Sequence, residues 1–146
     1  MTGASHASIG AALGALIRRP ALAFLAGAAS HIVTDALPHR DLPLRVEVAL
    51  LGATIGFIAA RHGARSPQFW GAVGAVAPDM EHALVELGII RAEDEVFPSH
   101  AWLGKYHGPP SSGPLSQIAA FVAGLLIAEW PQRGRAPTKN PEKSWA

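Results

Sequence analysis

The residues best suited to chemistry are a histidine and an aspartate four positions apart, in the segment from Ser30 to Asp35. On a helix such residues share a face, with Cβ atoms about 5–6 Å apart, so His31 and Asp35 can bind one ion or two adjacent ions. Pro38 is expected to end this helix, which leaves His39 able to turn back toward the same site. The alternative is a buried core histidine beside a solvated acid, but an acid without a partner on an apolar helix is costly. The spacing therefore favours a divalent-metal site.

A second group of chemically active side chains follows in the segment from Ala77 to His82. Asp79 and His82 are three apart and share a helical face, whereas Glu81 points elsewhere. Pro78 either kinks a long helix or begins a new one, and in the second case Asp79 could simply cap that helix. Because the first group already favours a metal site, we interpret Asp79 as a further metal ligand and His82 as an additional candidate ligand.

Three more histidines are candidate ligands. His6 is expected just before the first helix, and a lone histidine near a terminus is usually exposed. His100 and His107 lie in a Pro- and Gly-rich segment, where they either close over a site or belong to an ordinary surface loop. His62 resembles a helix C-terminal residue near the negative end of the helix dipole, and it is left out of the site.

The chain has no cysteine, so a metal site must use histidine, carboxylate and water. Such ligands suit Zn²⁺ or another divalent cation such as Mn²⁺. A bound ion of this kind activates water for hydrolysis. Glu81, or another carboxylate that does not bind the metal, is the candidate general base, and Asp35 is the other candidate catalytic residue.

The elements that must position these residues are helices. Five apolar stretches rich in Ala and Leu alternate with short Pro, Gly or Arg breaks, and none alternates as a strand would. Pro20 and Pro67 suit helix starts, while Gly63 and Gly88 suit helix ends. The expected fold is a compact all-α bundle of about five helices in one domain, residues 1–130, with a long Pro/Gly loop before the last helix and a basic, disordered tail over residues 131–146. The stretches run from about Ser8 to Ile17, Pro20 to Ala36, Leu44 to Ala60, Pro67 to Gly88 with an interruption at Pro78, and Leu115 to Trp130.

The composition favours a membrane-associated protein. Hydrophobic residues make up 49% of the chain and charged residues only 16%, below the roughly 25% of soluble domains. G-x-x-x-G pairs at Gly10/Gly14 and Gly52/Gly56 permit close helix packing. Arginines occur at several breaks and do not assign an orientation. We expect the bacterial inner membrane, with the cytoplasm as the alternative, and a net charge of +1 argues against nucleic-acid binding.

These elements resemble those of the membrane-bound metal-dependent hydrolase family, and more distantly zinc-dependent phospholipase C. The family carries an early histidine, a P-D-x-D-H element, a histidine-rich loop and an S-H-x-x-x-D helix. Similar elements here are His6, Pro78 to His82, the loop from His100 to His107, and Ser30 to Asp35. The last of these precedes the P-D element in this chain and follows it in the family. The resemblance implies an all-α fold, a zinc-type site and hydrolysis of a phosphoester.

The predicted function is therefore metal-dependent hydrolysis, with a small-molecule or lipid phosphoester as substrate. The candidate ligands are His6, His31, Asp35, His39, Asp79, His82, His100 and His107. One alternative is a non-catalytic membrane protein whose histidines bind a structural metal or line an ion path. Another is an interaction scaffold without a metal.

Overall fold

The computed structural model describes residues 1–40, 42–97 and 114–130. These residues form five α-helices and one short 3₁₀ helix, with no strand among them, which confirms the all-α prediction. The helices are α1 (Gly3–Ile17), α2 (Pro20–Asp35), α3 (Leu44–His62), α4 (Pro67–Glu86), η1 (Ala92–Asp94) and α6 (Leu115–Glu129).

Local sequence signals account for most helix ends. Pro20 and Pro67 occupy first-turn positions of α2 and α4, and Gly63, with φ of 87°, ends α3. The Ser66 side chain caps α4 by accepting a hydrogen bond from the backbone N–H of Phe69.

One expectation about the helices was wrong. The first helix begins at Gly3 and not near Ser8, because the Thr2 side chain accepts a hydrogen bond from Ser5 N–H and starts the helix earlier. His6 therefore lies inside α1 instead of before it. Of the two alternatives at Pro78, the structure has the single long helix: α4 is continuous through Pro78, so Asp79 does not cap a separate helix there.

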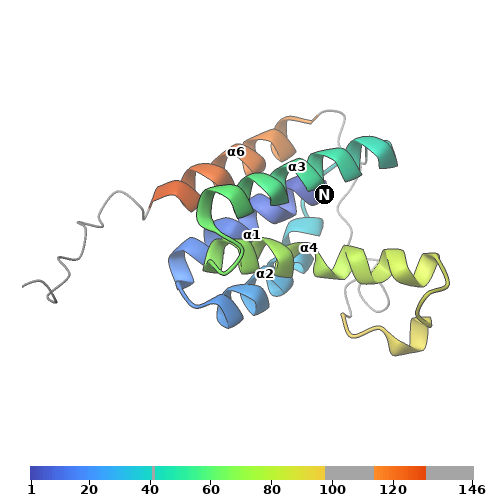
Figure 1. Cartoon of the computed structure of the whole chain (residues 1–146). Helices are drawn as coiled ribbons and strands as arrows, with labels where there is room; N and C mark the ends of the chain where they lie inside the picture. Colours follow the sequence, from blue (N-terminus) through green and yellow to red (C-terminus); the bar gives the residue numbers. More distant parts are fainter. Residues whose placement is uncertain (41, 98–113, 131–146) are drawn as a thin grey trace, which may run out of the picture.

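Helix α1 occupies the centre of the bundle, and it contacts α2, α3, α4 and α6 (Figure 1). The buried core is built mainly from small side chains. It centres on Ala7, Ala11, Ile58, Ala72, Val76 and Ala128.

Glycines bring three of the helices into backbone contact. A Cβ atom at Gly10 of α1 would overlap the carbonyl oxygen of Gly71 of α4, and a Cβ at Gly71 would overlap the carbonyl oxygen of Gly10. Gly27 of α2 meets the same carbonyl of Gly71, and Gly74 meets the carbonyl of Phe24. Helices α1 and α2 therefore approach α4 more closely than any larger residue at these positions allows.

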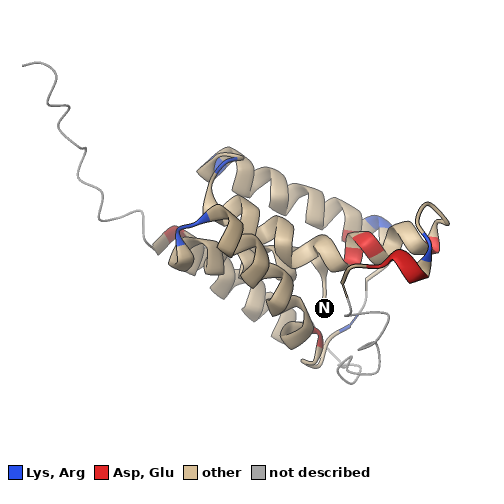
Figure 2. Ribbon diagram, turned by 90° about the horizontal axis from the view of Figure 1, so that it is seen from below, with Lys and Arg blue, Asp and Glu red and all other residues tan. Residues whose placement is uncertain are grey.

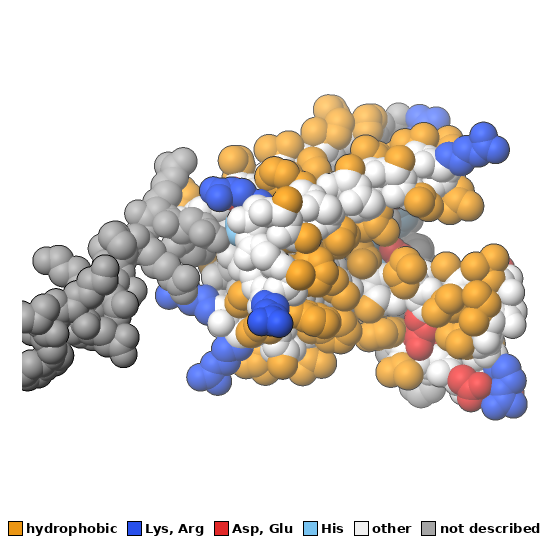
Figure 3. All heavy atoms as spheres, viewed as in Figure 1, with side chains coloured by type: hydrophobic (Ala, Val, Ile, Leu, Met, Phe, Trp, Pro, Cys, Tyr) orange, Lys and Arg blue, Asp and Glu red, His pale blue; other side chains and the backbone are white. Residues whose placement is uncertain are grey.

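Large apolar side chains are also exposed over much of the bundle, as the face in Figure 3 shows. Nevertheless, within the described ranges no helix combines the length and hydropathy needed to cross a bilayer. Membrane association therefore stays a prediction.

The glycine contacts predict a sharp difference between two helical Gly→Ala changes. We expect Gly71→Ala to lower stability by about 1–3 kcal/mol or more, because the new methyl group would force α1 and α4 apart. We expect Gly52→Ala on α3 to raise stability by about 0.5–1 kcal/mol, because a Cβ there meets nothing within 4 Å and alanine is the better helix former. Thermal unfolding followed by circular dichroism measures both shifts. Equal effects of the two changes would contradict the packing argument.

Candidate metal centre

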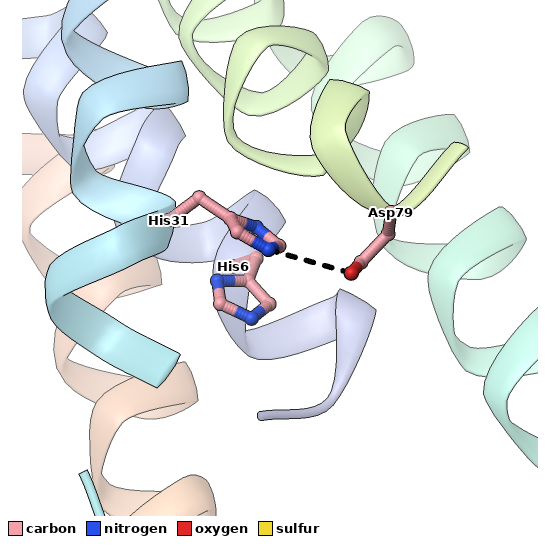
Figure 4. A group of neighbouring side chains, drawn as sticks. All are labelled: His6, His31 and Asp79. Carbon is pink, nitrogen blue, oxygen red and sulfur yellow. Dashed lines mark ion pairs between the residues drawn. The ribbon is translucent and has the colours of Figure 1, made fainter. Parts of the chain in front are cut away.

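Three helices each contribute a side chain to one polar cluster at one end of the bundle. His6 comes from the start of α1, His31 and Asp35 from the last turns of α2, and Asp79 from α4 directly after Pro78. Figure 4 shows the His31 imidazole turned toward the Asp79 carboxylate, with the His6 ring stacked against that of His31. The cluster joins residues 73 positions apart in sequence because α1 and α2 both pack against α4.

One ligand atom each from His6, His31 and Asp79 lies within 4.8 Å of the other two. Nε2 of His31 is 3.4 Å from Oδ1 of Asp79. In a tetrahedral zinc site with bonds of about 2.0–2.1 Å, neighbouring ligand atoms are about 3.4 Å apart. This pair is thus already at ligand spacing, and the ligand atom of His6 lies within 4.8 Å of both.

Neighbouring groups orient the two imidazole rings. Nδ1 of His31 donates to the carbonyl oxygen of Ala75 over 2.9 Å, and Nδ1 of His6 lies 2.9 Å from the hydroxyl oxygen of Thr34. The rings stack with centroids 4.2 Å apart. Because Nδ1 is engaged in both rings, both Nε2 atoms face the carboxylates, which is how metal-binding histidines are commonly held.

Asp35 links the cluster to the start of the chain. Its Oδ1 lies 2.9 Å from Nε2 of His6 and 2.7 Å from the amino group of Met1, and its Oδ2 lies 3.1 Å from Nε2 of His31. Burial tends to raise the pKa of this carboxyl, but the hydrogen bonds from His31, His6 and the Met1 amino group outweigh burial and hold the pKa far below its usual range. Asp35 is therefore a carboxylate at all ordinary pH values.

The two histidines respond differently to the same surroundings. Burial is the strongest influence on both residues. It lowers the pKa of His6, because the opposing hydrogen bond that His6 donates to Asp35 does not offset the cost of burial. For His31, the hydrogen bond to Asp35 and the charges of Asp79 and Asp35 outweigh burial and raise the pKa.

The chemistry of His31 explains why this site suits a cation. Because a carbonyl oxygen only accepts, Nδ1 carries the proton that is donated to Ala75, and Nε2 of the neutral ring carries a lone pair. That lone pair faces the carboxylates of Asp35 and Asp79 at 3.1 and 3.4 Å. Either a second proton or a metal ion on Nε2 removes the repulsion, so the cluster can exchange a proton for a divalent ion.

Other predicted site residues have different surroundings. His39 is buried, and its Nδ1 donates to the carbonyl oxygen of Leu37. His82 is half-exposed and lies 3.5 Å from Glu95 and 3.9 Å from Glu86. Neither belongs to the three-donor group among the described residues. His100 and His107 lie outside the described residues.

Glu81 contacts the backbone of the segment that follows η1. Its two carboxylate oxygens accept hydrogen bonds from the backbone N–H groups of Val96 and Phe97, each at 2.7 Å. This side chain therefore holds the 95–97 segment against α4.

Sequence reasoning missed two groups that orient the imidazoles. One is Thr34, which stands beside Asp35 and whose hydroxyl oxygen lies 2.9 Å from Nδ1 of His6. The other is the backbone carbonyl of Ala75, one turn before Asp79. Only Thr34 carried a sequence signal, as a polar residue on the apolar helix next to the candidate aspartate.

The geometry predicts which histidines a metal needs. We expect His31→Ala and Asp79→Ala each to weaken Zn²⁺ binding by more than roughly 100-fold, because loss even of an outer partner costs about 10–100-fold. We expect His82→Ala to leave the affinity unchanged. Isothermal titration calorimetry of the chelator-treated protein measures this, and equal losses in all three variants would refute the assignment.

The contacts of Glu81 predict a local structural role. We expect Glu81→Ala to speed hydrogen exchange at the Val96 and Phe97 amides by at least about tenfold, since each loses a charge-assisted hydrogen bond. Zinc affinity should not change, and Glu81→Gln should show a smaller effect because it keeps one acceptor. Unchanged exchange together with loss of hydrolysis would instead indicate a general base.

Comparisons with protein-family models, with curated proteins and with solved structures found no match to this chain. Function must therefore be inferred from the cluster itself. Its features are two oriented imidazoles, one adjacent carboxylate from a third helix, and a buried aspartate that contacts both imidazoles.

Proposed function

We propose that the protein is a metal-dependent hydrolase that binds a divalent cation through His6, His31 and Asp79. The observation that carries the proposal is the convergence of three ligand atoms, from three helices, within 4.8 Å of one another. Burial supports it as well, because His6 and His31 are 1% and 0% exposed and an apolar core rarely holds two imidazoles beside acids without a use for them.

Zinc is the ion that these ligands favour. Catalytic zinc sites commonly use three protein ligands of the histidine and carboxylate type and keep the fourth position for water or substrate. Manganese is the next candidate because it accepts the same ligands. Asp35 contacts both imidazoles and is the residue best situated to complete the site or to balance the charge of the ion.

The side chains divide the tasks of such a site. His6 and His31 are buried ligands, and their contacts with Asp35 hold them rigidly. The Asp79 side chain is 37% exposed and gives access from solvent. When bound, the ion supplies an activated water molecule and offsets charge that develops on the substrate oxygen. Rigid ligands with one open side are what hydrolysis requires, since the reacting groups must be held in one geometry.

The proposed substrate is a phosphoester. This choice rests on the resemblance to the membrane-bound metal-dependent hydrolases and to zinc-dependent phospholipase C. It is chemically consistent with the site, because a divalent ion stabilises charge on a phosphoryl oxygen well. The cluster itself contains no arginine or lysine among the described residues that would select a particular leaving group.

Hydrolysis of a chromogenic phosphodiester tests the proposal. We expect activity in the zinc- or manganese-loaded protein, loss of activity with a chelator, and recovery when the metal is returned. We expect Asp79→Asn to lower the rate by at least about 100-fold, because it removes a charged ligand while keeping its shape. His82→Gln is the matched control on the same helix and should keep full activity.

Asp35 needs a conservative change. Replacement by alanine would leave the buried Met1 amino group and two imidazoles without their carboxylate, at a cost of about 3–5 kcal/mol, so Asp35→Asn is the better variant.

Metal binding without hydrolysis of any phosphoester, phosphomonoester or carboxylic ester would indicate a structural metal instead. Absence of metal binding would exclude both metal functions.

A further inference from the structure

The fold gathers four arginines that lie far apart in sequence. Arg18 and Arg19 form the turn between α1 and α2. Arg61 lies in the last turn of α3, and Arg65 lies in the turn between α3 and α4. The two turns meet at one end of the bundle because Gly14, near the end of α1, packs against Pro67 at the start of α4. All four side chains are exposed. We call this end of the bundle, opposite the metal centre, the arginine end.

Acidic side chains lie almost entirely at one end of the bundle. At the arginine end Glu129 is the only acid in the described turns and helix ends, and it pairs with Arg61 over 2.9 Å. The other acids of the described ranges lie toward the metal centre and η1, as the red segments in Figure 2 show, and there they outnumber the three arginines of that end. Between the two ends, α1 carries no Asp, Glu, Lys or Arg at all. The arginine end is therefore net positive and the opposite end net negative.

Exposed apolar side chains surround the arginines. Leu16 and Leu25 are 63% and 62% exposed, and Leu22 and Trp70 are exposed as well. An apolar surface pocket lies next to them, between α2 and α4. It is lined by Pro20, Ala21, Phe24, Leu25 and Trp70. We call Leu16, Leu22, Leu25 and Trp70 the apolar collar.

We propose that the arginine end and the apolar collar dock on the surface of an anionic lipid bilayer. The arginines bind the headgroup phosphates, and the collar enters the boundary between headgroups and acyl chains. Basic residues beside Leu and Trp are the pattern by which peripheral proteins hold anionic membranes, with the indole ring at headgroup level. Docking in this orientation keeps the acidic end away from the negative surface.

Two other occupants fit the surface less well. A symmetric contact with a second copy would bring the four arginines against their own equivalents, where like charges repel. A nucleic acid would satisfy the arginines, but it would leave the apolar collar against phosphates and water. A bilayer satisfies both parts of the surface at once.

Docking would orient the metal centre. His6 and Arg18 are separated by twelve residues of α1, which is about 18 Å along the helix axis. On this orientation the metal centre faces away from the bilayer. A phosphoester would then reach it from the aqueous side, a consequence that rests on the proposed function, whereas the docking itself does not.

Vesicle sedimentation with the full chain tests the docking. We expect binding to phosphatidylcholine vesicles that contain phosphatidylglycerol and much weaker binding to phosphatidylcholine alone. Each arginine near an anionic surface strengthens binding about fivefold, so the triple variant Arg18→Gln, Arg19→Gln, Arg65→Gln should bind roughly 100-fold more weakly. Arg61 is left unchanged because it pairs with Glu129.

The matched control removes three arginines from the other end of the bundle. Arg40→Gln, Arg45→Gln, Arg91→Gln changes the net charge by the same amount, and its binding should remain within about twofold of the unaltered chain. Lysine at positions 18, 19 and 65 should restore binding. The basic residues after Pro131 are present in every variant and cannot produce a difference between them. Circular dichroism verifies that each variant is folded.

Quenching of Trp70 fluorescence by brominated lipids measures whether the apolar collar enters the bilayer. The other three tryptophans are changed to phenylalanine, and we expect quenching only in vesicles with phosphatidylglycerol. Equal loss of binding in both triple variants, or equal binding to neutral vesicles, would overturn the proposal, as would a stable dimer that binds no vesicle. Binding that persists with a chelator but without hydrolysis would leave the docking intact and count against the proposed function alone.

Discussion

Backbone contact between glycine-bearing helices is the constraint on which the rest of this structure depends. Gly10 and Gly27 each meet the carbonyl oxygen of Gly71, so that α1 and α2 both lie directly against α4. A helix pair separated by ordinary side chains would hold its axes about 8–10 Å apart, and polar groups on different helices would then need long side chains to meet. Here the short side chains of His6, His31 and Asp79 meet because the backbones do.

The same close packing explains how an apolar bundle tolerates a buried polar cluster. Burying His6, His31 and Asp35 without partners would be costly, but each finds one within hydrogen-bonding distance on another helix or at the chain start. The cluster is rigid because each imidazole is held through Nδ1 while its Nε2 faces a carboxylate. Such preorganisation is what a metal site or a catalytic site needs, since flexible ligands lose affinity to ordering.

Polarity along the bundle axis connects the proposed metal centre with the proposed membrane contact. The histidines of the cluster and most acidic groups lie where α1 begins and α2 ends, whereas four exposed arginines collect where α1 ends and α2 begins. Helix α1, which joins the two ends, carries no Asp, Glu, Lys or Arg. The proposed metal centre and the proposed lipid contact are therefore separated along the bundle.

Local patterns along the chain are enough to predict the helices and most of the candidate ligands. Apolar runs between prolines and glycines predict α2, α3, α4 and α6 closely, and the four-residue spacing of His31 and Asp35 holds in any helix. Helix packing determines which of the two G-x-x-x-G pairs is used: Gly10 is buried against α4 and Gly52 faces open space, although the local patterns are alike. Helix packing likewise brings His6 into the cluster, places Glu81 against backbone groups, and gathers four scattered arginines at one end of the bundle. Each of these depends on which helix lies beside which, and helix pairing is a long-range property that local spacing does not encode.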